Sequence, residues 1–330
     1  MDDRKFTLKK VTKFKDAEGV ENLTLPVSDL CLTTNELILQ FDYTEAEAKK
    51  EEISPGVYCV NSSDVGAISL VKTELREEPL LQSIDNTHRI KKEVEVFFKK
   101  LPIYEELGIS KSRKILLYSE PGCGKTAAIN RVIKDLINED SGTVAMIWPT
   151  NKVRSSDFKD FLSLNTFYSE KCTRVVITVE DIGGGEYDGP VGGREIDSGL
   201  LNFLDGVDLV FKLPTFIIAT TNYPQNLLGA LADRPGRFDQ MIELKPPSYD
   251  EKIALMEFIS KKSLTQEEKD IFNMKDAQNF SIAHLKEIIT RSMLHDKTYF
   301  EVAKDMIEHT TKFKNDFQKA KTLGIKNWDD

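Results

Sequence analysis

The sequence has few cysteines and no long apolar run, and both absences narrow the class of protein. Its four cysteines are scattered along the chain: Cys31, Cys59, Cys123 and Cys172. Because none forms a Cys-x-x-Cys pair, a disulfide framework or a zinc site is disfavoured, and reduced thiols in a cytoplasmic compartment are expected. The N-terminus has no apolar signal region, and no stretch reaches the roughly 18 consecutive apolar residues of a membrane span. We therefore expect no membrane segment and a cytoplasmic location.

The chain also has fewer basic than acidic residues, with 45 Lys and Arg against 54 Asp and Glu. The formal net charge of −9 works against a general attraction to phosphate backbones and makes nucleic acid a disfavoured partner. The best basic stretch, RKFTLKKVTKFK at residues 4–15, keeps a nucleic-acid motor or loader open, although a solvated edge strand is the preferred interpretation. With 330 residues, 40% of them hydrophobic and 30% charged, the chain is otherwise ordinary for a globular protein with a sizeable core.

The hydrophobic pattern divides the chain into three regions. Residues 1–82 have short apolar runs between turn formers, which predicts a small, mostly β domain with one short charged helix near 44–52. In residues 83–247, strands alternate with helical periods, as is typical of a doubly wound parallel sheet. Residues 248–330 show helical periods and predict a separate helical domain. The strands expected in the middle region are 114–118, 143–148, 174–179 and 215–220.

The stretch SEPGCGKT at residues 119–126 lies between an expected strand and an expected helix, as a phosphate loop requires. Its glycines, Gly122 and Gly124, let backbone N–H groups turn inward around an anion, and the helix start adds its positive dipole end. Lys125 would reach the β- and γ-phosphates of ATP, and the Thr126 hydroxyl would bind Mg²⁺. The nucleotide-binding set we expect is Glu120, Pro121, Gly122, Cys123, Gly124, Lys125, Thr126 and Ala127.

A second functional pattern is the strand end ITVEDIGGG at residues 177–185. In phosphate-loop hydrolases the first acid of such a pair holds the Mg²⁺ shell and the second polarises the attacking water. We therefore expect Glu180 at the metal, together with Thr126, and Asp181 facing the water. The usual order is Asp before Glu, so the reversed order shortens the reach of the second carboxylate and leaves the pair competent.

The stretch FIIATTNYPQNLLGALADRPGRFDQMIEL at residues 216–244 resembles the second region of homology of the AAA clade of AAA+ ATPases. The resemblance implies that Asn222 is sensor 1, which positions the attacking water. It also implies that Arg234 and Arg237 are arginine fingers for the γ-phosphate held by a neighbouring subunit. A planar, permanently charged guanidinium complements phosphoryl oxygens and stabilises charge in the transition state. The implied catalytic set is Asp181, Glu180, Asn222, Arg234 and Arg237.

Three further stretches refine the resemblance. SGLLNFLDGV at residues 198–207 and the Glu-Asp order resemble the branch containing the mitochondrial translocase of the Rieske iron–sulfur protein, without the membrane segment of that family. The segment 148–158 lacks the aromatic-apolar-glycine triplet with which many AAA unfoldases grip polypeptide. In FSIAHLKEI at residues 280–288, which resembles the lid segment near adenine, Ile282 replaces the usual glycine, and His284 is expected at the lid surface or the nucleotide edge.

The fold implied is an α/β, doubly wound, parallel-sheet phosphate-loop ATPase core with a C-terminal helical lid and a small, mostly β N-terminal domain. The function implied is a ring-forming, Mg²⁺-dependent ATPase, hexameric or heptameric, that remodels, unfolds or translocates a protein partner. Recognition would use residues 1–82 and the pore. Two alternatives stay open: a nucleic-acid motor or loader, and an ATP-gated scaffold with little turnover.

Overall fold

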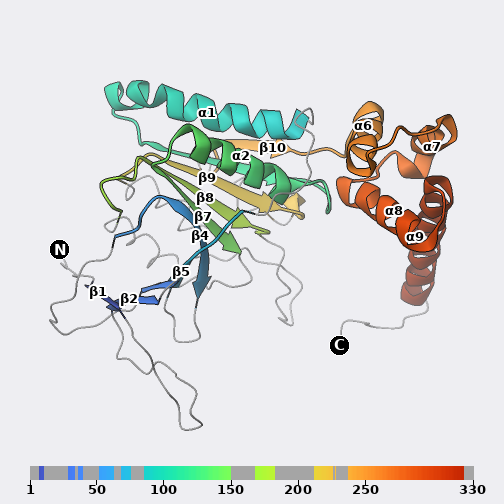
Figure 1. The fold of residues 1–330 in the computed structure, drawn as a ribbon, viewed down its shortest axis with the longest axis horizontal. Coiled ribbons are helices and arrows are strands. Elements are labelled where there is room, and N and C mark those ends of the chain that lie inside the picture. Colours follow the sequence, from blue (N-terminus) through green and yellow to red (C-terminus); the bar gives the residue numbers. More distant parts are fainter. Residues whose placement is uncertain are drawn as a thin grey trace, which may run out of the picture. The chain divides into compact units, whose positions relative to one another are not determined.

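The computed structural model describes about two thirds of the chain, in ten ranges: residues 7–10, 29–33, 36–39, 52–62, 68–75, 85–149, 168–182, 212–225, 227 and 237–322. The chain divides into two compact units (Figure 1). One unit comprises Met1–Glu77, Arg89–Ser119 and Ala128–Leu244. The other comprises Glu78–His88, Glu120–Ala127 and Lys245–Asp330.

Within the described residues, the first unit contains a single ten-stranded sheet in the order β1-β2-β3-β5-β4-β7-β8-β9-β6-β10. The strands are β1 (Thr7–Lys10), β2 (Asp29–Thr33), β3 (Glu36–Leu39), β4 (Gly56–Ser62), β5 (Ile68–Lys72), β6 (Ser112–Tyr118), β7 (Thr143–Pro149), β8 (Arg174–Glu180), β9 (Thr215–Thr221) and β10 (Gln240–Glu243). From β4 through β10 all neighbouring strands pair in parallel. Such strands are buried on both faces, which explains why all seven residues of β9 are buried.

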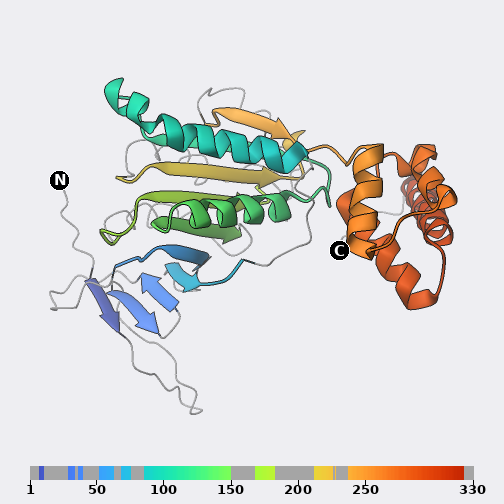
Figure 2. The same cartoon turned by 45° about the horizontal axis from the view of Figure 1, so that its top comes forward.

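Helices α1 (Asp85–Glu106) and α2 (Lys125–Glu139) lie side by side against the core strands (Figure 2). Lys91 Nζ of α1 bonds to Asp135 Oδ2 of α2 at 3.0 Å. On the sheet side, the ring of Phe97 meets Phe216 of β9 edge-on, with the ring centres 5.5 Å apart. The predicted α/β fold with a mostly parallel sheet is therefore confirmed, including the four strands expected in the middle region.

The N-terminal strands extend the core sheet. β4 pairs in parallel with β7, from Gly56 opposite Val144 to Cys59 opposite Ile147, and the described N-terminal strands attach through β4. The edge strand β1 contains Thr7–Lys10 of the basic stretch, which supports its interpretation as an edge strand. The helix expected near residues 44–52 lies outside the described residues, apart from Glu52.

The second unit is helical from residue 245 to residue 322, as the hydrophobic periods predict. Its helices are α6 (Tyr249–Ser260), α7 (Gln266–Asp270), α8 (Ile282–His295) and α9 (Tyr299–Thr322), with the short 3-10 turns η3 (Ile271–Asn273) and η4 (Lys275–Ala277). Capping boxes at the start of α6 and α7 pair Ser248 with Glu251 and Thr265 with Glu268. These caps satisfy backbone N–H groups that have no partner inside the helix.

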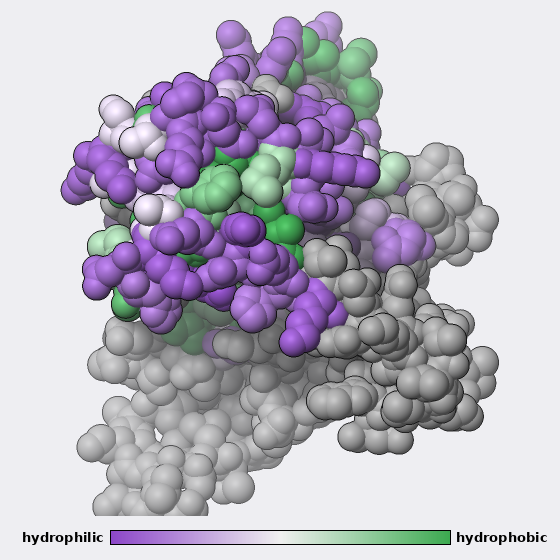
Figure 3. All heavy atoms as spheres, turned by 90° about the vertical axis from the view of Figure 1, so that its right-hand side faces the viewer, coloured by the Kyte–Doolittle hydropathy of each residue, from purple (hydrophilic) through white to green (hydrophobic). Residues whose placement is uncertain are grey.

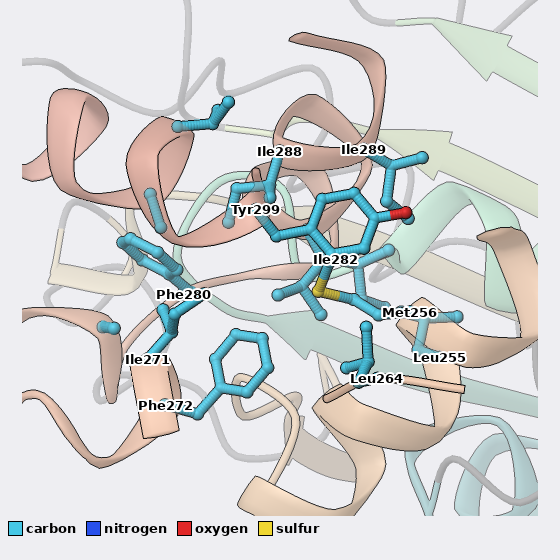
Figure 4. Close-up of a cluster of buried hydrophobic side chains, with 14 residues drawn as sticks. Leu255, Met256, Leu264, Ile271, Phe272, Phe280, Ile282, Ile288, Ile289 and Tyr299 are labelled. Carbon is cyan, nitrogen blue, oxygen red and sulfur yellow. The ribbon is translucent and has the colours of Figure 1, made fainter. Parts of the chain in front are cut away.

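A cluster of buried apolar side chains holds these helices together (Figure 4). Leu255, Leu285 and Ile288 are fully buried in it. Lys252 of α6 is also buried, and its ammonium donates hydrogen bonds to the carbonyls of Ala277 and Gln278. Because burial penalises the charged form, the pKa of Lys252 is lowered. Lys252 therefore links α6 to the carbonyls at the end of the η4 turn, at the edge of an apolar core.

The face drawn in Figure 3 is mainly hydrophilic, with hydrophobic residues in small groups. The most exposed large apolar side chains in the described part of the helical unit are Met293 and Leu294, at 76% and 71% exposure. Isolated exposures of this kind are normal on a protein surface. None of the helices in the described ranges has the length and apolarity needed to cross a membrane.

The pairing of β4 with β7 predicts how the chain responds to truncation. Removing residues 1–51 keeps β4 and β5 as a cover for β7, whereas removing residues 1–75 turns β7 into an exposed apolar edge. We expect the shorter deletion to stay soluble and the longer one to aggregate, measured by light scattering and thermal unfolding. Equal solubility of both would instead support an independent domain at residues 1–82.

Candidate functional site

The core strands bring several predicted side chains to one edge of the sheet. β6, β8 and β9 are parallel neighbours, with Tyr118 opposite Thr221 and Val179 opposite Ala219. Their carboxyl ends therefore share one edge, which is where open α/β sheets bind ligands. The acidic strand end and Asn222 lie at this edge, and the phosphate loop leaves β6 from it.

The two adjacent carboxylates have different backbone settings. Glu180 is the half-buried last residue of β8, whereas Asp181 is exposed and adopts a left-handed conformation with φ of +53°. Aspartate is one of the few residues that tolerate this region. The turn is fixed by Thr220 of β9, whose hydroxyl accepts a bond from Asp181 N at 3.0 Å and whose carbonyl accepts one from Ile182 N at 2.8 Å. Such different settings suit different roles for the two acids.

Asp181 contacts the predicted sensor directly. The side-chain amide Nδ2 of Asn222 donates a hydrogen bond to Asp181 Oδ1 over 3.0 Å. Thr221, just before Asn222, donates its hydroxyl to Ile182 O at 2.8 Å and accepts a bond from Tyr223 N at 2.9 Å. The structure thus joins two residues that were predicted separately to act on one water. The supporting threonines were not predicted, although the Thr-Thr-Asn sequence offers hydroxyls at that strand end.

The glycines of the phosphate loop are required for two reasons. Gly122 and Gly124 have φ of +81° and +83°, which favours glycine. A Cβ on Gly122 would lie 2.6 Å from Ser281 Oγ, and one on Gly124 would lie 2.8 Å from Ile282 Cδ1. The N-terminus of α8 therefore packs directly against the loop, and Ala283 N donates a hydrogen bond to Gly122 O at 3.1 Å.

The loop passes directly into α2, which begins at Lys125. Lys125 is 8% exposed and Cys123 2% exposed, while the Thr126 side chain faces solvent. A left-handed glycine turn followed by a helix N-terminus is an anion-binding geometry. The loop therefore fits a phosphate group. Whether each predicted residue contacts nucleotide stays a prediction.

His284 sits in the first turn of α8. Its Nδ1 accepts a hydrogen bond from Ser281 N at 3.2 Å and lies 2.8 Å from Ser281 Oγ. Its ring stacks on Phe280 with centres 5.2 Å apart. Partial burial lowers the pKa of His284, and the nearby Glu120 carboxylate opposes that effect. His284 is exposed, as expected at the lid surface, and its ring helps to cap the helix that touches the phosphate loop.

The predicted arginine finger Arg237 has a different setting. It is 7% exposed and precedes β10, whose first residue Gln240 lies opposite Ile115, the middle residue of β6. The backbone from Ile115 to Tyr118, at the end of β6, spans about 10 Å. Arg237 thus lies before the amino end of β10, whereas Asn222 follows the carboxyl end of β9. Arg234 lies outside the described residues.

Two of the stretches that refined the resemblance lie largely outside the described residues: all of 198–207, and 150–158 of the segment compared with a pore loop. Trp148, the first residue of the latter segment, is described and is fully buried in β7, so it belongs to the core.

The donor chemistry fits magnesium better than a metal held by protein alone. In the described part of the chain, no group of three or more His, Cys, Asp and Glu side chains could hold a metal ion. Mg²⁺ needs only one or two protein oxygens when phosphate oxygens and water complete its shell. The hydroxyl of Thr126 and the carboxylate of Glu180 are oxygen donors of that kind.

Comparison with known families agrees with this geometry. Residues 115–246 match the family described as "ATPase family associated with various cellular activities (AAA)". The chain contains an AAA ATPase domain. This AAA domain runs from β6 to just beyond β10, so it includes the phosphate loop, the acidic strand end, Asn222 and Arg237.

Curated relatives support the same assignment. The chain is 28% identical over 212 residues to a proteasome-activating nucleotidase of Thermococcus onnurineus (strain NA1), covering 62% of this chain and 48% of the relative. It is 29% identical over 206 residues to the proteasome-activating nucleotidase of Pyrococcus abyssi (strain GE5 / Orsay), covering 60% and 46%. It is 29% identical over 229 residues to the 26S proteasome regulatory subunit 4 homolog of Dictyostelium discoideum, covering 66% and 49%. The chain thus spans about half the length of these relatives.

The loop glycines generate a first test at the site. Gly122→Ala combines left-handed strain with a clash against Ser281 and Ala283, whereas Gly108→Ala has the strain alone, since nothing lies within 4 Å of its added Cβ. We expect Gly108→Ala to lose about 1 kcal/mol of stability and to keep ATP affinity. Gly122→Ala should weaken ATP binding at least about tenfold, because the N–H groups of its loop would shift. Calorimetric unfolding and fluorescent-nucleotide titration measure the two effects, and equal ATP affinity in both variants would contradict the prediction.

His284 generates a pH test. Its hydrogen bond from Ser281 N needs an unprotonated Nδ1, and its folded pKa is lowered from the ordinary value. The stabilising contribution is therefore present above the unfolded pKa near 6.5 and is lost as pH falls through the lower folded value. His284→Gln keeps a side-chain acceptor that does not titrate. We expect the melting temperature of the wild type to fall more than that of the variant between pH 7 and pH 5. Parallel curves would exclude the effect.

Proposed function

We propose that the chain is a ring-forming, Mg²⁺-dependent ATPase that uses ATP hydrolysis to remodel, unfold or translocate a protein partner. The observation that carries this proposal is the hydrogen bond between Asn222 and Asp181, at the sheet edge from which the phosphate loop leaves. In an AAA domain, a sensor amide bonded to the second acid of the pair provides a holder for the attacking water. A domain that only bound nucleotide would have no use for that arrangement.

Each residue then has a distinct task. Residues 120–127 would hold the phosphates through their backbone N–H groups, which Pro121 lacks, and through the Lys125 ammonium, while Thr126 and Glu180 would supply the protein oxygens for Mg²⁺. Bound Mg²⁺ neutralises charge on the phosphate oxygens. Asp181 orients the attacking water and draws its proton, and Asn222 fixes the direction of that carboxylate. Their settings support this division, because Glu180 is half-buried at the end of β8 whereas Asp181 is exposed and bonded to Asn222.

The arginines act in trans in this proposal. Arg237 lies before the amino end of β10, whereas Asn222 follows the carboxyl end of β9, and this supports action of Arg237, together with Arg234, on the nucleotide of a neighbouring subunit. A lone subunit would then have an incomplete site, so hydrolysis requires assembly. A hexamer is the form we propose, with a heptamer as the alternative suggested by resemblance to the Rieske-protein translocase branch.

The nature of the substrate is also part of the proposal. The relatives named above are proteasome-activating nucleotidases and a 26S proteasome regulatory subunit homolog. These names favour a protein as the class of substrate, engaged by residues 1–82 and the pore in the cytoplasm. The division into a recognition region at residues 1–82, an ATPase region at 83–247 and a lid at 248–330 belongs to the same proposal, with the described strands of the first region continuing the core sheet through β4.

Phosphate release by the assembled chain tests this function. We expect Lys125→Ala and Asp181→Asn each to lower turnover by about 100-fold or more, because one removes a phosphate contact and the other the water-facing charge. Arg237→Ala should lower turnover similarly while ATP affinity is retained. If the wild type and the first two variants are equally slow, the ATP-gated scaffold is the better description. If Arg237→Ala keeps full turnover, its role as a finger is wrong.

A further inference from the structure

Asp239 lies two residues after Arg237 and directly before β10. Its backbone N–H donates a hydrogen bond to Lys114 O at 2.8 Å. Its carboxylate Oδ2 accepts one from Lys114 N at 2.6 Å. Both bonds reach the same residue of β6, although Asp239 and Lys114 are 125 positions apart in the sequence. The aspartate therefore fastens the arginine-bearing segment to the core sheet at one fixed point.

The Asp239 carboxylate takes the place of a backbone carbonyl as a hydrogen-bond acceptor in the sheet. β10 begins to pair with β6 only at Gln240 opposite Ile115, so the preceding N–H of Lys114 needs an acceptor from elsewhere. Asp239 Oδ2 supplies it, and a charged acceptor makes a stronger bond than a carbonyl. Because the Asp239 side chain supplies the acceptor for Lys114 N, β10 need not extend to the residues before Asp239. The chain bends at Arg237, and the two hydrogen bonds of Asp239 hold the residues after this bend in place.

Other bonds secure β10 farther from the arginine. Arg113 Nη2 bonds to Gln240 Oε1 at the start of β10 and to Glu93 Oε2 of α1, both at 3.3 Å. Arg89 Nη1 of α1 donates to Glu243 O at the end of β10 over 3.1 Å. The four-residue edge strand is thus held at both ends. Of these anchored positions, Asp239 is the nearest to Arg237 in the sequence.

We infer that Asp239 is a positioning residue for Arg237: it fixes the arginine relative to β6 so that the guanidinium reaches the phosphate of the neighbouring subunit. This inference rests on the proposed function. A finger stabilises the transition state only from the right place, and a displacement of about 1 Å can cost on the order of 100-fold in rate. Asp239 itself does not touch substrate in this proposal.

The first test separates turnover from nucleotide binding. In Asp239→Ala the Lys114 N–H loses its acceptor, and we expect kcat of the assembled chain to fall by about 10- to 100-fold. KM for ATP should change little, because the phosphate loop of each subunit is untouched. Asp239→Asn keeps an acceptor oxygen and should retain most of the turnover. An unchanged kcat in Asp239→Ala would overturn the inference.

A second test asks which subunit carries the defect. Lys125→Ala subunits have a damaged phosphate loop and an intact Arg237, whereas Asp239→Ala subunits have the reverse. An equal mixture should release phosphate faster than the sum of the two variants alone, because intact arginines would serve the sites of the Asp239→Ala subunits. Folded variants that assemble together without any such recovery would overturn the inference.

Asp140 offers a matched control in the same sheet. Its carboxylate accepts bonds from Gly142 N at 2.8 Å and Thr173 Oγ1 at 2.7 Å, just before β7, and no arginine finger follows it. Asp140→Ala should lose stability in thermal unfolding without the loss in kcat, and an equal loss in kcat would overturn the specific role of Asp239. A wild-type assembly without ATPase activity would instead overturn the proposed function, and the role of Asp239 with it.

Discussion

The parallel register of β6, β8 and β9 is the constraint on which the rest of the site depends. Parallel neighbours necessarily end at the same edge, so one pairing pattern places Ser119, Glu180 and Asn222 along a single line. β10 begins opposite Ile115, the middle residue of β6, so Arg237 lies before the amino end of its strand. The parallel sheet therefore places the residues proposed to bind nucleotide at the carboxyl ends of strands, and the proposed arginine finger before the amino end of one.

Local patterns made much of this predictable. The short, β-branched run RVVITV favours a buried strand, and a GKT sequence after a glycine turn has few other uses between a strand and a helix. The Asp181–Asn222 pair followed indirectly, since both residues were assigned to the same water. The structure added the bond itself and the threonines that hold the turn.

Contacts between distant residues could not be predicted in this way. Nothing in the sequence of β4 indicates β7 as its partner, because pairing of β-branched strands has no local signature. The packing of Ser281 and Ile282 on the loop glycines joins positions more than 150 residues apart, and Asp239 resembles any other aspartate at a turn. The sequence pattern indicates which face of a helix or strand is buried. Only the three-dimensional structure shows which residues pack against that face.

The left-handed turn after β8 also bears on the reversed order of the acidic pair. A residue with φ of +53° is tolerated better as aspartate than as glutamate, whose longer side chain cannot bond its own backbone in the same way. Restoring the common Asp-Glu order would put glutamate into this turn at a cost of about 1 kcal/mol. The left-handed backbone at residue 181 and the Glu-Asp order thus favour each other. A change in one is expected to be accompanied by a change in the other.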